Sequence, residues 1–486
     1  MDRHILFYLV GRLILVNGLS LIIPLTAGLI WGERGILYFG PSLIAAVAFS
    51  AYCLYRGRHH KRQVGAGEGA WYMVLVWLIL SLLGMVPYVM AGVFTSPADA
   101  FFESVSAFTT TGTSVLADGG ASLPASLLLW HSLMGWLGGL NFILMLVSVM
   151  PLVSGCFGLT LSVHQSVSFS PMVASMQDAA RKVGCIYLAI TTFSVILYWL
   201  AGLSPEAAVN QGLVTLSTSG GDSLFDFLRY DSRALEGAGA LSMLLASGNF
   251  LLYWKSWERR SLKIFLHDAE LRYFLMMFVG VSAVVSFHLW HYGVYDGWDN
   301  LRYGFFQVLS FISTSGFTST SMADWPEFDK YVLFLLAFIG GCIGSSTGGL
   351  KVMRFMVLFK MTAQELRRTL HPRMVVSLKI DGVPVDMNIV SRVLSYFFLV
   401  IMTFFASMLI ISLAGVTPIQ SMAMAMAVGC LSSVGSTMAL FGVTDIASLP
   451  AWTKVYCGFL MILGRVEIFP ILLVIQHSVG YVWRRW

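Results

Sequence analysis

Long apolar runs recur along the whole chain, separated by shorter and more polar connections. A helix that crosses a bilayer needs about 20 mostly apolar residues. Ten runs reach roughly this length, at about residues 5–31, 36–55, 71–94, 125–153, 183–202, 235–254, 271–292, 331–359, 389–415 and 452–482. The pattern predicts an all-α polytopic membrane protein with ten transmembrane helices.

The composition indicates the same class. Of the 486 residues, 57% are hydrophobic and only 11% are charged, which is more apolar surface than a soluble domain can bury. The net charge of +5 is spread over short basic clusters between the apolar runs, unlike a nucleic-acid-binding patch. The six cysteines form no Cys-x-x-Cys motif, so we expect neither a disulfide framework nor a zinc site. We therefore expect membrane lipid, and no nucleic acid, around this chain.

The basic residues predict the orientation of the chain. Most of the 30 lysines and arginines fall in connections on one side, including a cluster at 56–62 and a long polar connection at about 360–388. By the positive-inside rule this side is cytoplasmic, and both termini lie on it. The 360–388 connection is either a solvated loop that fixes topology or a docking surface for a cytosolic partner. The run from Ile5, interrupted by Arg12, is interpreted as a retained first span and not a cleaved signal peptide.

Four outward-facing connections share one design, a short amphipathic segment followed by a hydroxyl-rich turn around a glycine. The segments begin near Pro97, Pro205, Trp298 and Pro418 and are too short to cross a membrane. The turns read Thr109-Thr110-Thr111-Gly112-Thr113, Ser217-Thr218-Ser219-Gly220-Gly221, Ser313-Thr314-Ser315-Gly316-Phe317 and Ser432-Ser433-Val434-Gly435-Ser436. Each segment stands between two full spans, so a unit of span, half-helix, turn and span is repeated four times in one orientation. This distinguishes the chain from transporters built of inverted repeats.

Such a turn suits a dehydrated cation, which needs a cage of oxygen atoms. Irregular backbone is tolerated at membrane depth where it lines a cavity, and glycine allows carbonyl groups to point at one axis. The half-helix before each turn directs the negative end of its dipole toward the same place. A single Thr-Ser-Gly turn would be an ordinary extracellular loop, but four in one register favour one cation pore per chain.

With these motifs the chain resembles the TrkH type of the Trk/Ktr/HKT superfamily of potassium transporters. The resemblance covers about residues 70–486, and the two extra leading spans favour the TrkH type. It implies potassium uptake across a bacterial inner membrane, K⁺ as the bound and transported ion, a homodimer, and a cytosolic nucleotide-binding TrkA-like subunit. It also implies a K⁺ selectivity filter made by Thr110, Thr111, Gly112, Thr218, Ser219, Gly220, Thr314, Ser315, Gly316, Ser433, Val434 and Gly435. The second turn departs from the usual Ser-Thr-Gly-Gly-Phe type of pattern.

The eighth apolar run is interrupted by many glycines and hydroxyl residues, which should break a helix in its middle. The resemblance implies that this segment is an intramembrane gate below the filter, together with an arginine of the last span. Close helix packing through Gly340, Gly344 and Gly348 is the alternative. A phosphate-binding loop is excluded by the position of the lysine. The predicted gate residues are Gly340, Gly341, Gly344, Ser345, Ser346, Thr347, Gly348, Gly349, Lys351 and Arg465.

The last span carries two charges, Arg465 and Glu467. A charge inside an apolar run is costly and usually faces a water-filled cavity. Residues two apart on a helix do not face each other, so the two side chains need different surroundings. The resemblance places Arg465 in the pore below the filter; a buried ion pair with another span is the alternative.

The repeats divide the chain into two N-terminal helices at 1–62 and pore repeats at 63–180, 181–265, 266–375 (with a broken second span) and 376–486. No His-Glu-x-x-His or Gly-x-Ser-x-Gly motif is present, so we expect neither an enzyme nor a covalent cofactor. A proton- or sodium-coupled secondary transporter of another small solute is the alternative function. It would need several intramembrane carboxylates, and the runs hold essentially one, Glu467. Channel-like conduction and coupling to H⁺ or Na⁺ both fit these residues.

Overall fold

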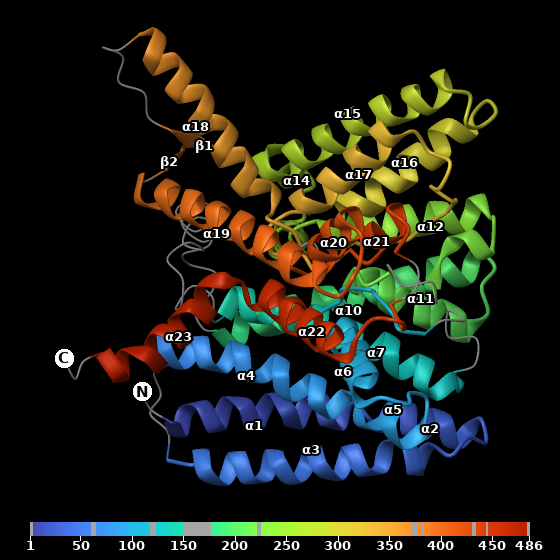
Figure 1. Ribbon diagram of the computed structural model, residues 1–486, viewed down its shortest axis with the longest axis vertical. Helices are drawn as coiled ribbons and strands as arrows, with labels where there is room; N and C mark the ends of the chain where they lie inside the picture. Colours follow the sequence, from blue (N-terminus) through green and yellow to red (C-terminus); the bar gives the residue numbers. More distant parts are fainter. Residues whose placement is uncertain are drawn as a thin grey trace.

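The computed structural model is almost wholly helical (Figure 1). It describes residues 3–59, 65–116, 123–148, 176–220, 225–371, 378–381, 383–385, 387–429, 434–443 and 446–483. Within these ranges the only strands are β1 (Lys379–Ile380) and β2 (Val383–Pro384), which pair antiparallel beside a helix that extends beyond the rest of the molecule.

The first three helices form a separate layer at one edge of the molecule (Figure 1). They are α1 (Arg3–Leu19), α2 (Ile22–Ile30) and α3 (Gly35–Gly57). Helices α1 and α3 pack closely because small residues face each other: a Cβ on Gly18 would lie 2.7 Å from that of Ala46. The Ser50 hydroxyl donates to the carbonyl oxygen of Gly11 at 2.8 Å and adds a polar contact to this apolar interface.

The remaining helices follow the predicted order of span, half-helix and span. The first group is α4 (Ala66–Gly84), α5 (Val86–Ala91), α6 (Pro97–Phe108) and α7 (Ala125–Ser148). The second is α10 (Met176–Leu200), α11 (Pro205–Ser217), the 3-10 turn η3 (Phe227–Arg229), α12 (Arg233–Ser247), α13 (Phe250–Arg259) and α14 (Lys263–His267). The third is α15 (Ala269–His291), α16 (Asp299–Ile312), α17 (Glu327–Ile339) and α18 (Val352–Leu370). The fourth is α19 (Met387–Ser412), α20 (Pro418–Met424), the π-helical turn η4 (Ala425–Gly429), α21 (Ser436–Leu440), α22 (Ala451–Val466) and α23 (Ile468–Trp483).

In the part of the chain that the structure describes, seven helices are long and apolar enough to cross a membrane. The number rises to nine if two bent pairs each count as one span, α12 with α13 (bent by 90°) and α22 with α23 (bent by 103°). The run predicted at 331–359 is missing from this set because α17 ends at Ile339 and α18 begins only at Val352. The break that the glycines predict is therefore present, and the total of ten spans stays a prediction.

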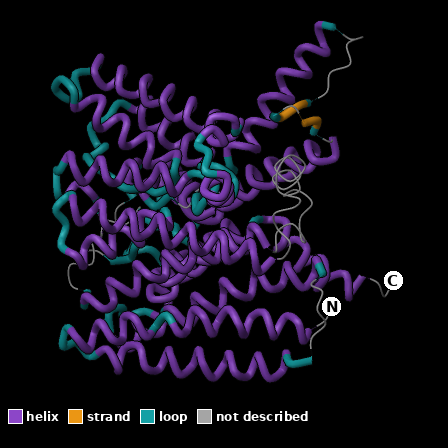
Figure 2. Tube along the Cα trace, turned by 180° about the vertical axis from the view of Figure 1, so that it is seen from behind, coloured by secondary structure: helices purple, strands orange, loops and turns teal. Residues whose placement is uncertain are grey.

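The half-helices start where their sequences carry helix-initiation signals. Proline occupies the first turn of α6, α11 and α20, where its missing N–H costs no hydrogen bond. The hydroxyls of Ser96, Ser204 and Thr417 cap the same three helices, and Thr417 forms a capping box with Gln420. Helix α16 has no side-chain cap from Trp298. Loop segments enclosed by the helices lie near the middle of the molecule, as Figure 2 shows.

Candidate functional site

Three of the four glycine turns share one backbone conformation. Thr110, Thr218 and Thr314 each stand two residues before the turn glycine, and their φ angles are 53°, 58° and 53°. A positive φ is rare for a β-branched residue and costs about 1–2 kcal/mol. Because the same unfavourable conformation recurs at the same place, the turns repeat in structure as well as in sequence. In the fourth turn the corresponding residue, Ser433, lies outside the described residues.

Hydroxyl groups brace these three turns in the same way. The residues flanking each threonine bond to each other through their side chains, and the first of them also donates to a half-helix carbonyl. The oxygen–oxygen distances are 2.9 Å for Thr109 and Thr111, 2.8 Å for Ser217 and Ser219, and 2.9 Å for Ser313 and Ser315. The flanking hydroxyls therefore hold the shape of each of the three turns.

The four glycines serve two different physical needs. Gly112 and Gly316 have left-handed φ angles of 66° and 75°, as the sequence argument expects. Gly435 has φ −57°, and Gly220 is not among the residues with positive φ. At Gly220 a Cβ would overlap the ring of Phe317, and at Gly435 it would overlap the carbonyl group of Gly112. At these two positions close packing, and not backbone conformation, requires glycine.

The turns also contact one another in pairs. The backbone N–H of Gly220 donates to the carbonyl oxygen of Ser315 at 2.8 Å, which joins the second turn to the third. The N–H of Gly435 donates to the carbonyl oxygen of Thr111 at 2.9 Å, which joins the fourth turn to the first. Residues 95 positions apart in one pair and 324 in the other are thus brought into contact.

The loop between α17 and α18, residues 340–351, is a closed structure. Its two ends are joined by hydrogen bonds from Leu350 N to Phe338 O at 3.1 Å and from Lys351 N to Ile339 O at 2.8 Å. Gly340, Gly344 and Gly349 have left-handed φ angles, as does Lys351 (φ 75°). Helix packing through glycines, the alternative reading of this segment, would require a helix at these positions, and the backbone is not helical there.

The tip of this loop contacts the second and third turns. The hydroxyl of Thr218 donates to the carbonyl oxygen of Ser346 at 3.2 Å, and the N–H of Gly348 donates to the hydroxyl of Thr314 at 2.8 Å. The Ser346 hydroxyl donates to the carbonyl oxygen of Leu216, at the end of α11, at 2.7 Å. The side chains of Ser345 and Thr347 bond to each other at 2.6 Å inside the loop. Two of the three left-handed threonines, Thr218 and Thr314, therefore connect their turns to the loop.

Arg465 connects the first turn to the same loop. Its Nε donates to the carbonyl oxygen of Thr109 at 2.5 Å, and its Nη1 donates to the carbonyl oxygen of Ser346 at 3.1 Å. The guanidinium group lies 4.5 Å from the ring centroid of Phe142 and is 2% exposed. The Nζ of Lys351 donates to the carbonyl oxygen of Thr347 and lies 5.4 Å from the same ring, so two cations converge here.

Glu467 has different surroundings, as its spacing from Arg465 predicts. Its carboxylate accepts two hydrogen bonds from Nη2 of Arg354, at 3.0 and 3.1 Å, and both side chains are buried. Among the described residues no carboxylate pairs with Arg465. The buried ion pair that we considered for Arg465 therefore belongs to Glu467. Arg354 was not predicted as a partner, although its charge lies inside the apolar run at 331–359.

Two further groups that hold the loop were missed in the sequence. Glu270 accepts a hydrogen bond from the N–H of Ile343 at 2.7 Å and is buried near the start of α15. At the bend between α12 and α13, the N–H of Phe250 donates to the carbonyl oxygen of Gly344 at 3.1 Å. From the sequence, Glu467 was expected to be essentially the one carboxylate of the spans. The structure adds further buried carboxylates: Glu236, inside the run predicted at 235–254; Glu270, one residue outside the run at 271–292; and Glu103 of half-helix α6.

These features define a multi-pass helical membrane protein in which half-helices and a broken span bring irregular backbone together at its centre. Comparison with known proteins agrees with this class. The TrkH family, described as cation transport proteins, matches residues 39–484. The chain belongs to this family, which is a family of transporters and not of enzymes.

Several relatives match over nearly their whole length. The Trk system potassium uptake protein TrkG of Escherichia coli K12 is 30% identical over 494 residues, covering 99% of each chain. TrkH of Salmonella typhimurium is 30% identical, covering 96% of this chain and 97% of its own. The crystal structure of the potassium transporter TrkH from Vibrio parahaemolyticus matches with a TM-score of 0.87 and 26% identity, covering 98% of this chain and 99% of that one. The resemblance and the helical membrane fold inferred from the sequence are thereby confirmed.

Proposed function

We propose that the protein takes up K⁺ through a single pore whose selectivity filter is formed by the four glycine turns. The observation that carries this proposal is the repeated turn geometry, with a left-handed threonine between two bonded hydroxyl residues in three turns that contact one another or the same loop. The relatives named as potassium uptake proteins support the choice of ion.

The braced turns suit the replacement of an ion's hydration shell. The flanking hydroxyls bond within each turn and hold its backbone carbonyl groups in fixed positions, where they can replace the water around an ion. Half-helices α6, α11 and α16 end at these turns and direct the negative ends of their dipoles toward the bound cation. Rigid oxygen ligands favour the ion whose size they fit. The second turn differs from the other three turns, because its sequence departs from the usual pattern.

We further propose that residues 340–351 and Arg465 form a gate below the filter. The loop contacts the second and third turns, and Arg465 links the first turn to the loop through Ser346. A positive charge on the ion path raises the barrier for a cation by Coulomb repulsion. A closed loop held against the filter together with a buried guanidinium group is the arrangement expected of a shut pore.

The remaining expectations extend this proposal to the assembly. We propose a homodimer in a bacterial inner membrane, with both termini cytoplasmic and a TrkA-like nucleotide-binding subunit docked on the basic segment that begins at Arg367. Residues 372–377 of that segment lie outside the described residues. Of the proposed repeat boundaries, the ones after residues 180 and 265 fall inside α10 and α14.

The filter is tested by changing Gly316 to Ser in purified protein reconstituted into liposomes. The new Cβ meets a left-handed φ of 75°, a cost of about 1–2 kcal/mol that falls on the turn itself. We expect the ratio of K⁺ to Na⁺ flux to fall while the protein still folds. This ratio is obtained by measuring the fluxes of K⁺, Rb⁺, Na⁺ and Li⁺ into the liposomes.

A matched control isolates the filter from general backbone strain. Gly293 has a similar φ of 64°, and no atom lies within 4 Å of a Cβ placed on it. Gly293→Ser carries the same conformational cost away from the turns, so the flux ratio should not change. If Gly316→Ser keeps the wild-type ratio as well, the four turns are not the selectivity filter.

A further inference from the structure

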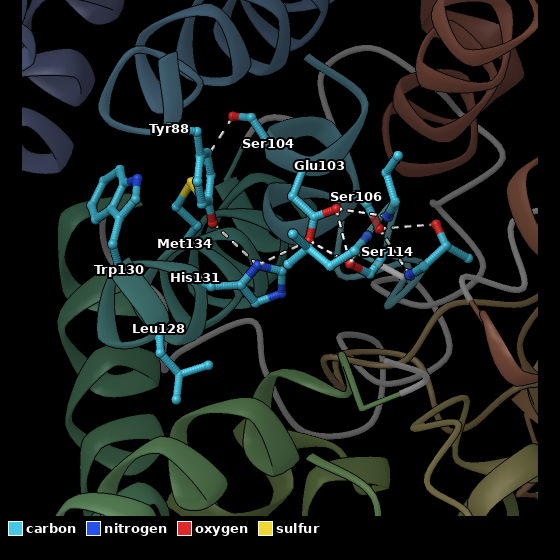
Figure 3. Close-up of polar contacts among 12 residues, drawn as sticks. Tyr88, Glu103, Ser104, Ser106, Ser114, Leu128, Trp130, His131 and Met134 are labelled. Atoms are coloured by element: carbon cyan, nitrogen blue, oxygen red, sulfur yellow. Dashed lines mark hydrogen bonds and ion pairs between the residues drawn. The ribbon is translucent and has the colours of Figure 1, made fainter. Parts of the chain in front are cut away.

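A fully buried carboxylate stands behind the first turn. Glu103, in the middle of α6, accepts a hydrogen bond from the N–H of Val115 at 3.0 Å and from the hydroxyl of Ser114 at 3.0 and 3.1 Å (Figure 3). Nδ1 of His131, from α7, lies 3.4 Å from the carboxylate and 3.2 Å from the hydroxyl of Tyr88. Residues 114 and 115 directly follow the turn, so the carboxylate holds the segment by which the chain leaves it.

The adjacent residues are held from the same half-helix. The hydroxyl of Ser106 accepts a hydrogen bond from the N–H of Thr113 at 2.9 Å and lies 3.0 Å from its hydroxyl. Residues 113, 114 and 115 are thus bonded in succession to the side chains of α6. We call residues 113–115 the outgoing segment of the first turn. Its position relative to Gly112 depends on Ser106 and Glu103.

The position of Glu103 in its half-helix is occupied by other residue types in the other three repeats. The residue nine places before the turn glycine is Glu103 in the first repeat, Gln211 in the second, Gln307 in the third and Met426 in the fourth, and all four side chains are buried. Gln211 donates to the carbonyl oxygen of Phe225 at 3.1 Å, and Gln307 donates to the hydroxyl of Ser319 at 3.5 Å. The position therefore braces the chain beyond the turn in three repeats, and only the first repeat has a carboxylate there.

A carboxylate differs from an amide at this place in the charge that it can carry. The N–H of Val115 and the hydroxyl of Ser114 both donate to Glu103, and an ionised carboxylate offers acceptors on both of its oxygens. A glutamine oxygen could accept from both donors, as one carboxylate oxygen does here, but glutamine would bring no charge to the site. Hydrogen bonds to a charged group are also stronger than neutral ones, and a buried charge acts over a longer distance than an exposed one.

We propose that Glu103 is a positioning residue of the filter. Through Glu103, the first turn sets the affinity for K⁺ and the preference for K⁺ over Na⁺. Its carboxylate holds the outgoing segment in place and sets a negative charge behind one side of the ring of turns. The other three repeats carry neutral side chains at the position nine residues before the turn glycine. This inference rests on the proposed function, because it assigns a role within the same filter.

The test compares Glu103→Gln with the wild type in liposomes, over a range of K⁺ and Na⁺ concentrations. Loss of a charge-assisted hydrogen bond should raise the half-saturating K⁺ concentration and lower the K⁺ to Na⁺ flux ratio, each by about fivefold to tenfold. The maximal K⁺ rate should change by less than about twofold, because Glu103 acts on binding and not on the gate. Ser114→Ala removes one of the two donors and should shift both quantities in the same direction by a smaller factor.

A matched control separates this role from stability. Glu236, which pairs with Arg302 at 2.6 Å, is another buried carboxylate on a helix that does not end at a turn. Glu236→Gln should lower thermal stability and leave half-saturation and selectivity unchanged. If Glu103→Gln does not fold, Glu103→Asp, which keeps the charge but is shorter, and Ser114→Ala must still shift half-saturation and selectivity.

Two results would overturn the inference alone, and a third would overturn the proposed filter on which it rests. A uniform loss of flux for all ions at wild-type half-saturation and selectivity would make Glu103 structural only. Wild-type behaviour of the Glu103 and Ser114 variants, with Gly316→Ser still reducing selectivity, would remove the inference and keep the filter. If Gly316→Ser also behaves as wild type, the proposed filter itself has failed.

Discussion

The second spans of the third and fourth repeats are both broken, and the two breaks differ in what holds them. Their outer ends correspond closely: Lys330 donates to the carbonyl oxygen of Ala323 at 2.9 Å, and Lys454 to that of Ala447 at 2.6 Å, with the same spacing. In the third repeat the break is the loop at 340–351. In the fourth it is a single residue, Glu467, with φ 65°.

The contacts at the two breaks have different strengths. The fourth-repeat break is fixed by the bidentate pair of Glu467 with Arg354, whose guanidinium carbon also lies 4.1 Å from the ring centroid of Tyr396. The third-repeat loop contacts the second and third turns and α11 directly through neutral hydrogen bonds of Ser346 and Gly348. The charged groups that hold it, Arg465 and Glu270, bind neutral backbone groups of the loop. The neutral bonds contribute about 0.5–1.5 kcal/mol each and can be exchanged one at a time. We infer that the loop is the part that can move and that the Arg354–Glu467 pair is the fixed support beside it.

The largest effect on stability should come from the fixed support. Glu467→Gln leaves the buried guanidinium group of Arg354 without its counter-charge, and removing one partner of a buried pair costs about 3–5 kcal/mol. Thermal unfolding of the purified protein measures this loss. The double variant Arg354→Met with Glu467→Gln should be less destabilised than the single one. A single variant with the wild-type transition would mean that the pair does not fix this break.

A large effect on transport should come from the loop. Deleting Gly344–Thr347 removes Ser346 and with it the contacts to Thr218, Leu216 and Arg465. We expect Rb⁺ flux to rise by about tenfold or more, since several hydrogen bonds of about 1 kcal/mol each then no longer hold the shut state. Flux should also become insensitive to nucleotide and the cytosolic partner. A deletion that folds and conducts like the wild type would make the loop a packing element.

A smaller increase should follow from Arg465→Ala. The change removes a positive charge near the turns and two hydrogen bonds to carbonyl groups, without stranding a carboxylate. Rb⁺ uptake should rise several-fold with little loss of thermal stability. Arg465→Lys, which keeps the charge, should stay closer to the wild type. A less stable and less active alanine variant would instead make Arg465 structural.

The smallest effect should come from one hydroxyl. Thr314→Val keeps the β-branched shape but removes the acceptor of the Gly348 N–H, a loss of about 1 kcal/mol. Rb⁺ flux should rise by a few-fold. Thr110→Val is the matched control, because the Thr110 hydroxyl is buried and forms no hydrogen bond in the structure. Equal changes in Rb⁺ flux for the two valine variants would mean that the hydrogen bond between Gly348 and Thr314 does not hold the loop in its shut position.

Much of the local structure was predictable. The starts of α6, α11 and α20 follow from proline and capping residues, and the end of α17 follows from the glycine at 340. The left-handed threonines were not predicted, because no single residue favours φ above zero at a β-branched position. Hydroxyl bracing within each turn and, for Thr218 and Thr314, hydrogen bonds to the loop support that conformation.

Hydrophobic periodicity, glycine spacing and the distribution of basic residues are local properties, and they were sufficient for the membrane class, the repeated unit and the family resemblance. The partners across the molecule were decided only by the tertiary structure. Glu467 pairs with Arg354, and Gly435 packs on Gly112, across long separations that no local pattern encodes. The physical reason is that the energetic effect of a buried charge, or of a missing Cβ, depends on the group that packs against it, and that group lies far away in the sequence.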